Sequence, residues 1–190
     1  KKRQLSIAAS LCHFSWRDRS VNLFDTPGDP SFHADTLASL RVVEGAVVVV
    51  NAANGLEVQH ERLWSHCEQN HVSRIVFVNM MDRERADFEA VLAQLQESFG
   101  QGAVAAAIPI GAEDKFEGIV NLLSLKAYKY ESGKASEINI PEGLTGVVEQ
   151  YREQLMDSVA ENDDAVMEKY LEGQDISNEE LFSALKAGVA

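Results

Sequence analysis

Two short segments carry side chains whose types and spacing could bind a nucleotide. The first, Asp25-Thr26-Pro27-Gly28, directly follows a predicted strand and precedes a helical stretch. A carboxylate at the carboxyl end of a sheet strand can hold Mg²⁺ through water. Gly28 lets its backbone N–H approach an anion with no side chain in the way. On its own, the segment could also be a tight turn after a strand.

The second segment, Asn79-Met80-Met81-Asp82, follows another predicted strand. An amide and a carboxylate at this spacing can face a purine edge, and the carboxylate can accept two N–H donors from guanine. Alone, the spacing is frequent by chance. The ordered pair of segments, each at a strand end in one α/β unit, predicts a guanine-nucleotide fold.

The elements that must position these segments alternate between short apolar runs and amphipathic stretches from Leu5 to Ile110. This alternation is typical of strands joined by helices in a mostly parallel sheet, so the predicted fold class is α/β. Residues 5–14 and 21–24 predict a hairpin around a polar turn at residues 15–20, and its second strand ends in Asp25.

The β-branched runs at residues 45–50 and 74–78 predict interior strands with helices on both faces. A helix is predicted between the N-cap Asp87 and the stop signal Gly100. Its apolar stripe consists of Phe88, Val91, Leu92, Leu95 and Phe99.

Beyond Gly111 the pattern changes to a strand pair, predicted at residues 119–130 and 138–140, that is followed by helices. One of these helices has the apolar stripe Val148, Tyr151, Leu155 and Val159. Another begins with the capping box Ser177-Asn178-Glu179-Glu180. A strand pair followed by helices predicts a subdomain.

Composition excludes several classes of protein. The 190 residues include 17 Lys and Arg against 30 Asp and Glu, a formal net charge of −13, which argues against direct nucleic-acid binding by this segment. Apolar residues make up 45%, enough for a core and too many for intrinsic disorder. No apolar run reaches the roughly 20 residues of a membrane span.

Cys12 and Cys67 lack the spacing of a metal site, so buried free thiols and a reducing, cytoplasmic setting are predicted.

Several motifs together resemble bacterial elongation factor G and its elongation-factor-G-like paralogues. The similarity runs nearly end to end, and the stretch PIGAEDKF belongs to an insert that sets this family apart from other translational GTPases. The segments that carry it are residues 25–32, 41–47, 76–83, 109–120 and 167–173.

The resemblance implies a ribosome-associated GTPase that binds GTP or GDP with Mg²⁺ and couples its nucleotide state to translocation or ribosome recycling. It implies a P-loop-NTPase-type fold with a mostly parallel sheet and an antiparallel edge hairpin, plus an inserted α+β subdomain. Residues 1–110 then form a partial GTP-binding domain, and residues 111–190 form the insert. In this family the insert faces a ribosomal stalk protein, which makes that protein a possible partner.

The resemblance also assigns roles to individual residues. Ser6 stands where the first switch of the family has its Mg²⁺-binding Thr, and Asp25 corresponds to the carboxylate that holds Mg²⁺ through water. Gly28 corresponds to the amide that contacts the γ-phosphate. Asn79 and Asp82 correspond to the residues that read guanine.

Two positions depart from the family pattern. Asp29 stands where the family has the His that positions the attacking water, and a carboxylate there would hinder rather than help hydrolysis. Asp29 could instead cap the helix that begins near Ser31 or His33. Met80 replaces the Lys whose stem lies over the base, so apolar packing is kept and the ammonium is lost.

The phosphate-binding loop G-x-x-x-x-G-K-[ST] does not occur in the sequence. We therefore expect an internal piece of a longer protein, truncated before and after, that by itself binds no nucleotide tightly and is inactive. The alternative is a noncatalytic nucleotide-fold binding module whose hydrolysis residues have degenerated.

Overall fold

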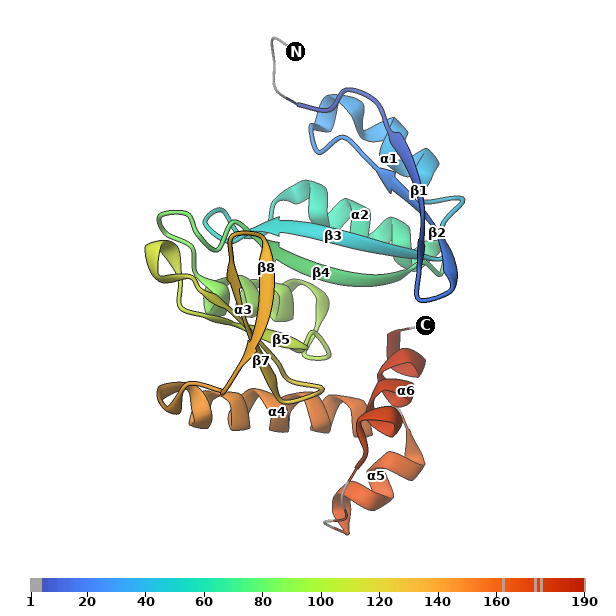
Figure 1. The fold of residues 1–190 in the computed structure, drawn as a ribbon. Coiled ribbons are helices and arrows are strands. Elements are labelled where there is room, and N and C mark those ends of the chain that lie inside the picture. Colours follow the sequence, from blue (N-terminus) through green and yellow to red (C-terminus); the bar gives the residue numbers. More distant parts are fainter. Residues whose placement is uncertain (1–4, 162, 173, 175, 190) are drawn as a thin grey trace. The chain divides into compact units, whose positions relative to one another are not determined.

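The computed structural model describes residues 5–161, 163–172, 174 and 176–189 (Figure 1). The chain divides into two compact units. The N-terminal unit contains residues 1–48 and 58–75, and the C-terminal unit contains residues 49–57 and 76–190. Strands β3 (Gly45–Asn51) and β4 (Ser73–Asn79) form a two-stranded parallel sheet and run from one unit into the other. The α/β fold class with a parallel sheet and antiparallel hairpins is confirmed.

The N-terminal unit begins with an antiparallel hairpin of β1 (Ser10–Trp16) and β2 (Arg19–Asp25). The second strand ends at Asp25, as predicted. The predicted turn at residues 15–20 is too long, and the first strand starts at Ser10 rather than Leu5. Arg17 and Asp18 both have positive φ (45° and 59°), which is typical of a two-residue type I′ turn and lets the strands pair right up to it.

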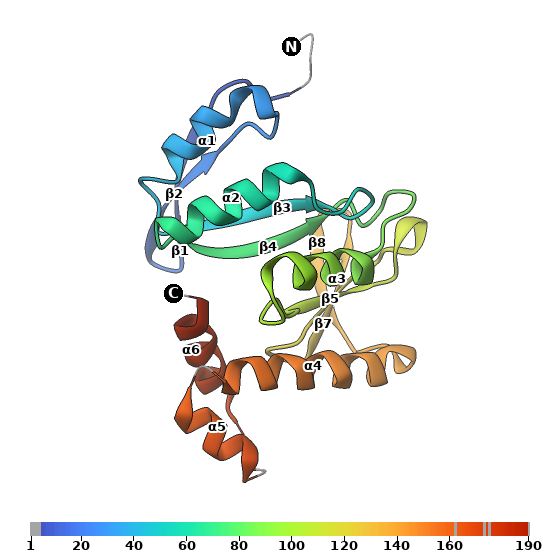
Figure 2. The ribbon, with the colours of Figure 1, turned by 180° about the vertical axis from the view of Figure 1, so that it is seen from behind.

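Three helices complete the N-terminal unit: the 3₁₀ helix η1 (Pro30–Phe32), α1 (His33–Ser39) and α2 (Val58–Gln69). Helix α2 lies alongside β3 (Figure 2), and Leu63 of the helix and Ala46 of the strand both pack against the buried cluster that contains Cys67. Cys67 is buried, and burial raises the pKa of its thiol although Arg74 opposes the shift. The prediction that Cys12 is also buried is wrong, since it lies on β1, where every residue is exposed.

Exposure alternates along both strands, between buried or half-buried and exposed residues in β3 and between half-buried and exposed residues in β4. Val48 and Val50 are 7% and 0% exposed, whereas Val47 and Phe77 are 61% and 56% exposed. The prediction of strands covered on both faces is therefore wrong for the described residues. The residues on one face of this sheet are packed against the rest of the protein, and the β-branched residues on the other face are exposed.

The C-terminal unit begins its helical part with α3 (Phe88–Phe99), which confirms the predicted boundaries. The Asp87 Oδ1 atom accepts a hydrogen bond from the Ala90 N–H at 2.9 Å and caps the helix. Gly100 follows with a φ of 99°, a conformation that favours glycine. Val91, Leu92 and Leu95 are the buried residues of the predicted stripe.

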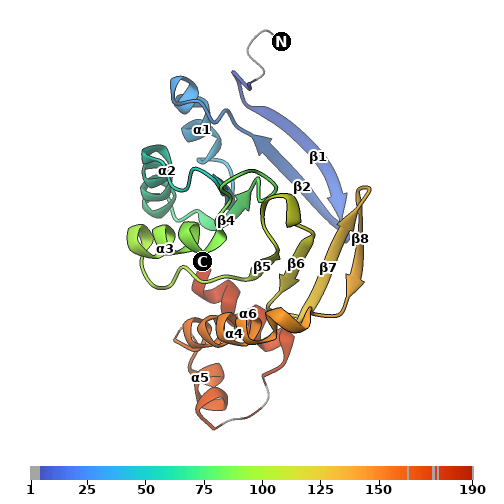
Figure 3. The same ribbon diagram turned by 90° about the vertical axis from the view of Figure 1, so that its left-hand side faces the viewer.

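A four-stranded antiparallel sheet follows, in the order β5 (Ala107–Ile110), β6 (Gly118–Asn121), β7 (Lys126–Glu131) and β8 (Lys134–Ile138) (Figure 3). The single strand predicted at residues 119–130 is thus two strands. Asn121 causes the break, because its Oδ1 atom accepts hydrogen bonds from the Leu123 and Ser124 N–H groups and closes a turn. The second predicted strand, at residues 138–140, is also misplaced, since β8 ends at Ile138.

Helices α4 (Thr145–Ala160), α5 (Asp164–Leu171) and α6 (Asn178–Val189) pack with this sheet into the main core. The predicted stripe on α4 is confirmed, since Val148, Leu155 and Val159 are at most 4% exposed. The sheet contributes a cross-strand row of buried residues, Ile108, Val120 and Ala127. Short 3₁₀ helices, η2 (Glu113–Lys115) and η3 (Glu142–Leu144), lie after β5 and before α4. The predicted domain boundary at residues 110 and 111 stays a prediction.

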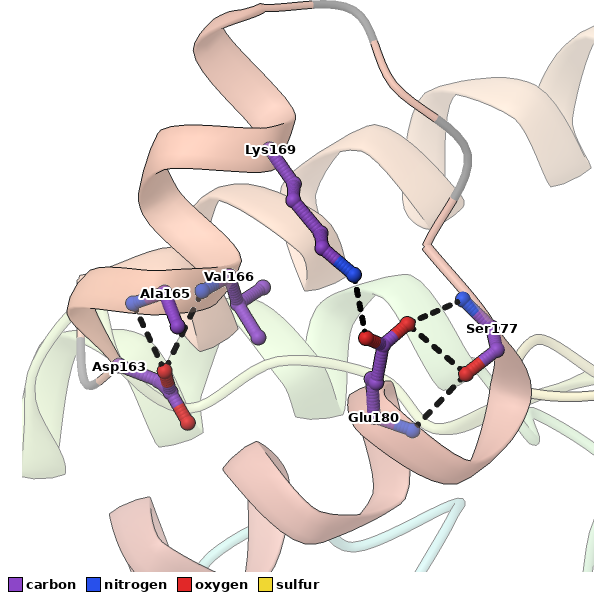
Figure 4. Close-up of polar contacts among 6 residues, drawn as sticks. All are labelled: Asp163, Ala165, Val166, Lys169, Ser177 and Glu180. Carbon is purple, nitrogen blue, oxygen red and sulfur yellow. Dashed lines mark hydrogen bonds and ion pairs between the residues drawn. The ribbon is translucent and has the colours of Figure 1, made fainter.

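The capping box of α6 is present as predicted (Figure 4). The Ser177 N–H donates to the Glu180 carboxylate at 3.0 Å, and the Glu180 N–H donates to Ser177 Oγ at 3.3 Å. Lys169 of α5 also contacts Glu180, and its hydrogen bond, together with those from Ser177, lowers the pKa of Glu180 to about 2. Across the residues that the structure describes, no helix is long and apolar enough to cross a membrane.

Candidate nucleotide-binding site

The first group of predicted site residues lies in one loop of the N-terminal unit, after β2. Asp25 and Gly28 are exposed, whereas Pro27 between them is buried. The Thr36 hydroxyl of α1 donates to the Pro27 carbonyl at 3.2 Å, and Thr36 is only 7% exposed. A Cβ atom at Gly28 would meet nothing within 4 Å, so the space over this backbone amide is open. An exposed amide without a side chain can approach a phosphate oxygen.

Asp29 caps the 3₁₀ helix that follows this loop. Its Oδ1 atom accepts a hydrogen bond from the Ser31 N–H at 2.8 Å, and its carbonyl accepts one from the Phe32 N–H at 3.0 Å. The carboxylate at the position of the family's water-positioning His therefore already binds a backbone donor of its own chain. This is the capping role that the sequence left open as the alternative for Asp29.

The predicted Mg²⁺ ligands are both in the N-terminal unit. Asp25 is the last residue of β2 and lies opposite Ser10 in the hairpin, while Ser6 precedes β1. Between Ser6 and β1, the Ala9 N–H donates to the Asp35 carboxylate of α1 at 3.2 Å, which connects this part of the chain to the helix. Both candidate ligands are exposed and offer oxygen atoms, the donor type that Mg²⁺ requires, so the residues fit the ion.

The second group lies in one loop of the C-terminal unit, where β4 ends. Asn79 is the last residue of β4, and its carbonyl accepts a hydrogen bond from the Ala52 N–H at 2.8 Å. Its side-chain Oδ1 atom accepts one from the Met80 N–H at 2.9 Å. Asp82 is exposed, with its carboxylate open to a ligand. Asn79 at the end of β4 and Asp82 in the loop after it therefore belong to one continuous segment, and their role in reading guanine stays a prediction.

The two methionines of this loop have different roles. Met81 is 6% exposed and packs in a small core cluster with Ala52 and Ala86. Met80, at the position of the family's Lys, is 43% exposed and has a φ of 63°. Its sulfur atom accepts a hydrogen bond from Asn51 Nδ2 at 3.3 Å. The loop is therefore anchored through one methionine and leaves the other at the surface.

Sequence reasoning missed Glu113. The Glu113 N–H donates to the Met81 carbonyl at 2.7 Å, and the Glu113 carboxylate accepts from the Arg85 N–H at 2.6 Å. The residue belongs to the PIGAEDKF stretch, which supported the resemblance without suggesting a role for any side chain in it. The signal that could have drawn attention to it is Gly111, a glycine that follows the apolar residues 108–110 and stands just before the charged residues 113–115.

Comparison with known proteins confirms the family resemblance. The family model of the elongation factor Tu GTP binding domain matches residues 1–187. An elongation factor G-like protein from Thermotoga maritima is 38% identical over 188 residues, which are 99% of this chain and 27% of that protein. A crystal structure from Thermus thermophilus matches 96% of this chain and 27% of its own, with a TM-score of 0.86 and 28% identity. The chain thus spans about a quarter of the length of these relatives.

Proposed function

Because the chain belongs to the family of the elongation factor Tu GTP-binding domain, we propose that it reads guanine through Asn79 and Asp82 within a longer translational GTPase similar to elongation factor G. The observation that carries the proposal is the loop at the end of β4. Asn79 and the exposed Asp82 stand on it, and the buried Met81 anchors it between them. Such a rigid support matters because acceptor atoms that are already held in position bind a base at a lower cost of ordering.

The proposed chemistry is that of charge-assisted hydrogen bonds. The two oxygens of Asp82 accept the two N–H donors on the guanine edge, which adenine does not present in the same way. The Asn79 amide supplies a further polar group beside the base. On the phosphate side, Gly28 offers its open backbone amide, and Ser6 and Asp25 would hold the Mg²⁺ ion. A bound Mg²⁺ would neutralise charge on the phosphates.

The proposal places the whole protein on the ribosome, in the cytoplasm, with GTP or GDP as its ligand. It also extends to a contact between the part after Gly111 and a ribosomal stalk protein, and it includes no direct nucleic-acid binding by this acidic segment. These assignments rest on the family resemblance and on the net charge of −13.

The experiment that tests base recognition is Asp82→Asn in the full-length protein. We expect weaker GTP binding and a relaxed rejection of XTP, because an amide can donate to the extra oxygen of xanthine and loses one of the two acceptors for guanine. Competition binding with GTP and XTP measures both effects. Glu84→Gln is the matched control, since it removes one exposed carboxylate two positions away in the same segment. An unchanged GTP-to-XTP preference in Asp82→Asn contradicts the proposal.

Residues 1–190 alone give the baseline for this experiment. The sequence holds no phosphate-binding loop of the form G-x-x-x-x-G-K-[ST], so several charge-assisted hydrogen bonds to the phosphates are missing. Calorimetric titration with GTP and Mg²⁺ is expected to show no appreciable binding. A micromolar dissociation constant for residues 1–190 would contradict the expectation that tight nucleotide binding needs the phosphate-binding loop.

A second function is favoured by the hydrogen bond between Asp29 and the Ser31 N–H. A carboxylate that caps a helix at the water-positioning site suits a protein that binds nucleotide and partners without fast hydrolysis. In this reading the chain is a noncatalytic nucleotide-fold binding module, with the same guanine-reading residues.

A further inference from the structure

A loop outside the predicted site forms hydrogen bonds with the backbone on both sides of Asp82. The Glu113 N–H donates to the carbonyl of Met81, the residue directly before Asp82, at 2.7 Å. The carboxylate of the same Glu113 accepts from the backbone N–H of Arg85 at 2.6 Å. A single residue therefore holds the backbone both before and after the guanine-reading carboxylate.

The loop needs a glycine at one position and holds a strained backbone at another. Gly111 has a φ of 76°, and a Cβ atom there would lie 2.0 Å from the Lys115 carbonyl oxygen. Glu113 has a φ of 57°, in the left-handed region that side chains other than glycine rarely adopt. Arg85, which donates to it, has a φ of 65°. Strained backbone persists only where the surroundings over-determine it, and such positions cluster at functional sites.

Packing joins the same two segments. Met81 is 6% exposed and lies in a core cluster against which Ala112 and Phe116, the residues on either side of the 3₁₀ helix η2, are packed. Glu113 starts that helix, so its backbone position is set by the contacts that bury Met81. The loop and the guanine-reading segment are thus one packed structure within the C-terminal unit.

We infer that Glu113 is a positioning residue that sets guanine specificity by fixing the backbone on both sides of Asp82. The inference rests on the proposed function of Asp82. Two parallel hydrogen bonds to guanine require that both carboxylate oxygens keep a set direction. When the hydrogen bond to Arg85 is lost, residues 82–85 gain freedom to rotate, and both bonds to the base weaken together. A ligand recognised by a single bond is affected less.

The test compares four variants of the full-length protein. Glu113→Ala removes the acceptor for the Arg85 N–H, whereas Glu113→Gln keeps an oxygen acceptor in the same place. Glu113→Gly also removes the acceptor but accommodates the positive φ, so it keeps the measurement possible if the alanine variant folds poorly. Asp114→Ala is the matched control, an exposed carboxylate next in the chain.

The quantity to measure is the ratio of the dissociation constants for GTP and XTP, since a general loss of stability leaves this ratio unchanged. We expect Glu113→Ala and Glu113→Gly to lower the preference for GTP by about tenfold, the effect of one hydrogen bond. Glu113→Gln should keep the preference for GTP over XTP within about threefold of that of the original protein. Asp114→Ala should leave this preference unchanged. Rescue by glutamine would show that the acceptor atom is what matters.

Asp82→Asn, measured in parallel, separates the inference from the proposed function. If Asp82→Asn relaxes the GTP preference but the alanine and glycine variants of Glu113 keep it, the inference is wrong and the function of Asp82 stands. Equal weakening of GTP and XTP binding in the Glu113 variants also overturns it, because Glu113 then acts on stability alone. If Asp82→Asn leaves the preference unchanged, the proposed function itself fails.

Discussion

The two loops that carry the candidate site differ in how the chain supports them. The Asn79–Asp82 loop is held by the buried Met81 and by backbone hydrogen bonds from Ala52 and Glu113. The Asp25–Asp29 loop follows a hairpin whose first strand is exposed along its whole length. It is held by the Thr36 hydroxyl and by the helix cap of Asp29.

If the proposed function holds, this difference divides nucleotide binding between a base-reading loop and a phosphate-side loop. A loop anchored in a packed core keeps its geometry whether or not a ligand is present, which lowers the cost of binding a base. A loop held mainly by two side-chain hydrogen bonds has a lower cost of local rearrangement. We therefore expect the base-reading loop to be preformed in this chain and the phosphate-side loop to depend more on its surroundings.

The largest expected effect is that of Met81→Ala. Deleting a buried methionine side chain costs about 2–5 kcal/mol of unfolding free energy, and here it also loosens the segment between Asn79 and Asp82. Urea unfolding measures the first effect, and GTP binding to the full-length protein measures the second.

Met81→Leu is the matched control, because it keeps the volume and should cost less than about 1.5 kcal/mol. If Met81→Ala changes stability by less than about 0.5 kcal/mol, the size of an ordinary surface substitution, the loop is not anchored by the core and the contrast between the two loops disappears.

The next effect is that of Asp29→His on hydrolysis. If an imidazole is the missing group, single-turnover GTP hydrolysis by the full-length protein on ribosomes should rise by about tenfold or more. Loss of the cap should at the same time cost about 1 kcal/mol of stability, which the thermal midpoint reports.

Asp29→Asn separates the two roles, because asparagine caps a helix as well as aspartate but carries no charge. A rate that rises only with His supports a damaged catalytic position. An unchanged rate with a lower midpoint leaves Asp29 as a cap and favours the noncatalytic binding module.

The smallest effect sharpens the description of the phosphate-side loop. Thr36→Val removes the hydroxyl that donates to the Pro27 carbonyl and keeps a side chain of similar shape. The expected loss is about 1 kcal/mol, or a fall in thermal midpoint of about 2–4 °C for a chain of this size.

Ser39→Ala is a useful comparison, since the Ser39 hydroxyl donates to the Asp35 carbonyl within α1 and does not contact the loop. We expect Thr36→Val, but not Ser39→Ala, to weaken nucleotide binding by the full-length protein. Equal behaviour of the two variants would mean that the Thr36 contact stabilises the helix rather than the loop.

Local sequence signals predicted the elements with strong caps and clear periodicity. The α3 boundaries follow from Asp87, Gly100 and a stripe at helical spacing, all of which act within a few residues of one another. The Ser177–Glu180 capping box of α6 is recognisable for the same reason. The prediction of one strand over residues 119–130 failed because asparagine occurs both in strands and in turns. The Asn121 side chain closes a turn in the middle of this apolar run.

The sequence by itself determined the order of the strand ends and the residue types placed there, because Asp25, Gly28, Asn79 and Asp82 follow apolar runs whose pattern can be recognised without coordinates. It could not determine which distant residues hold those ends in place. The contacts of Glu113 with Met81 and Arg85 join positions 28 residues or more apart. They depend on how β5 and the loop after it pack against the end of β4, and only the tertiary structure decides such a long-range arrangement, because no local pattern encodes it.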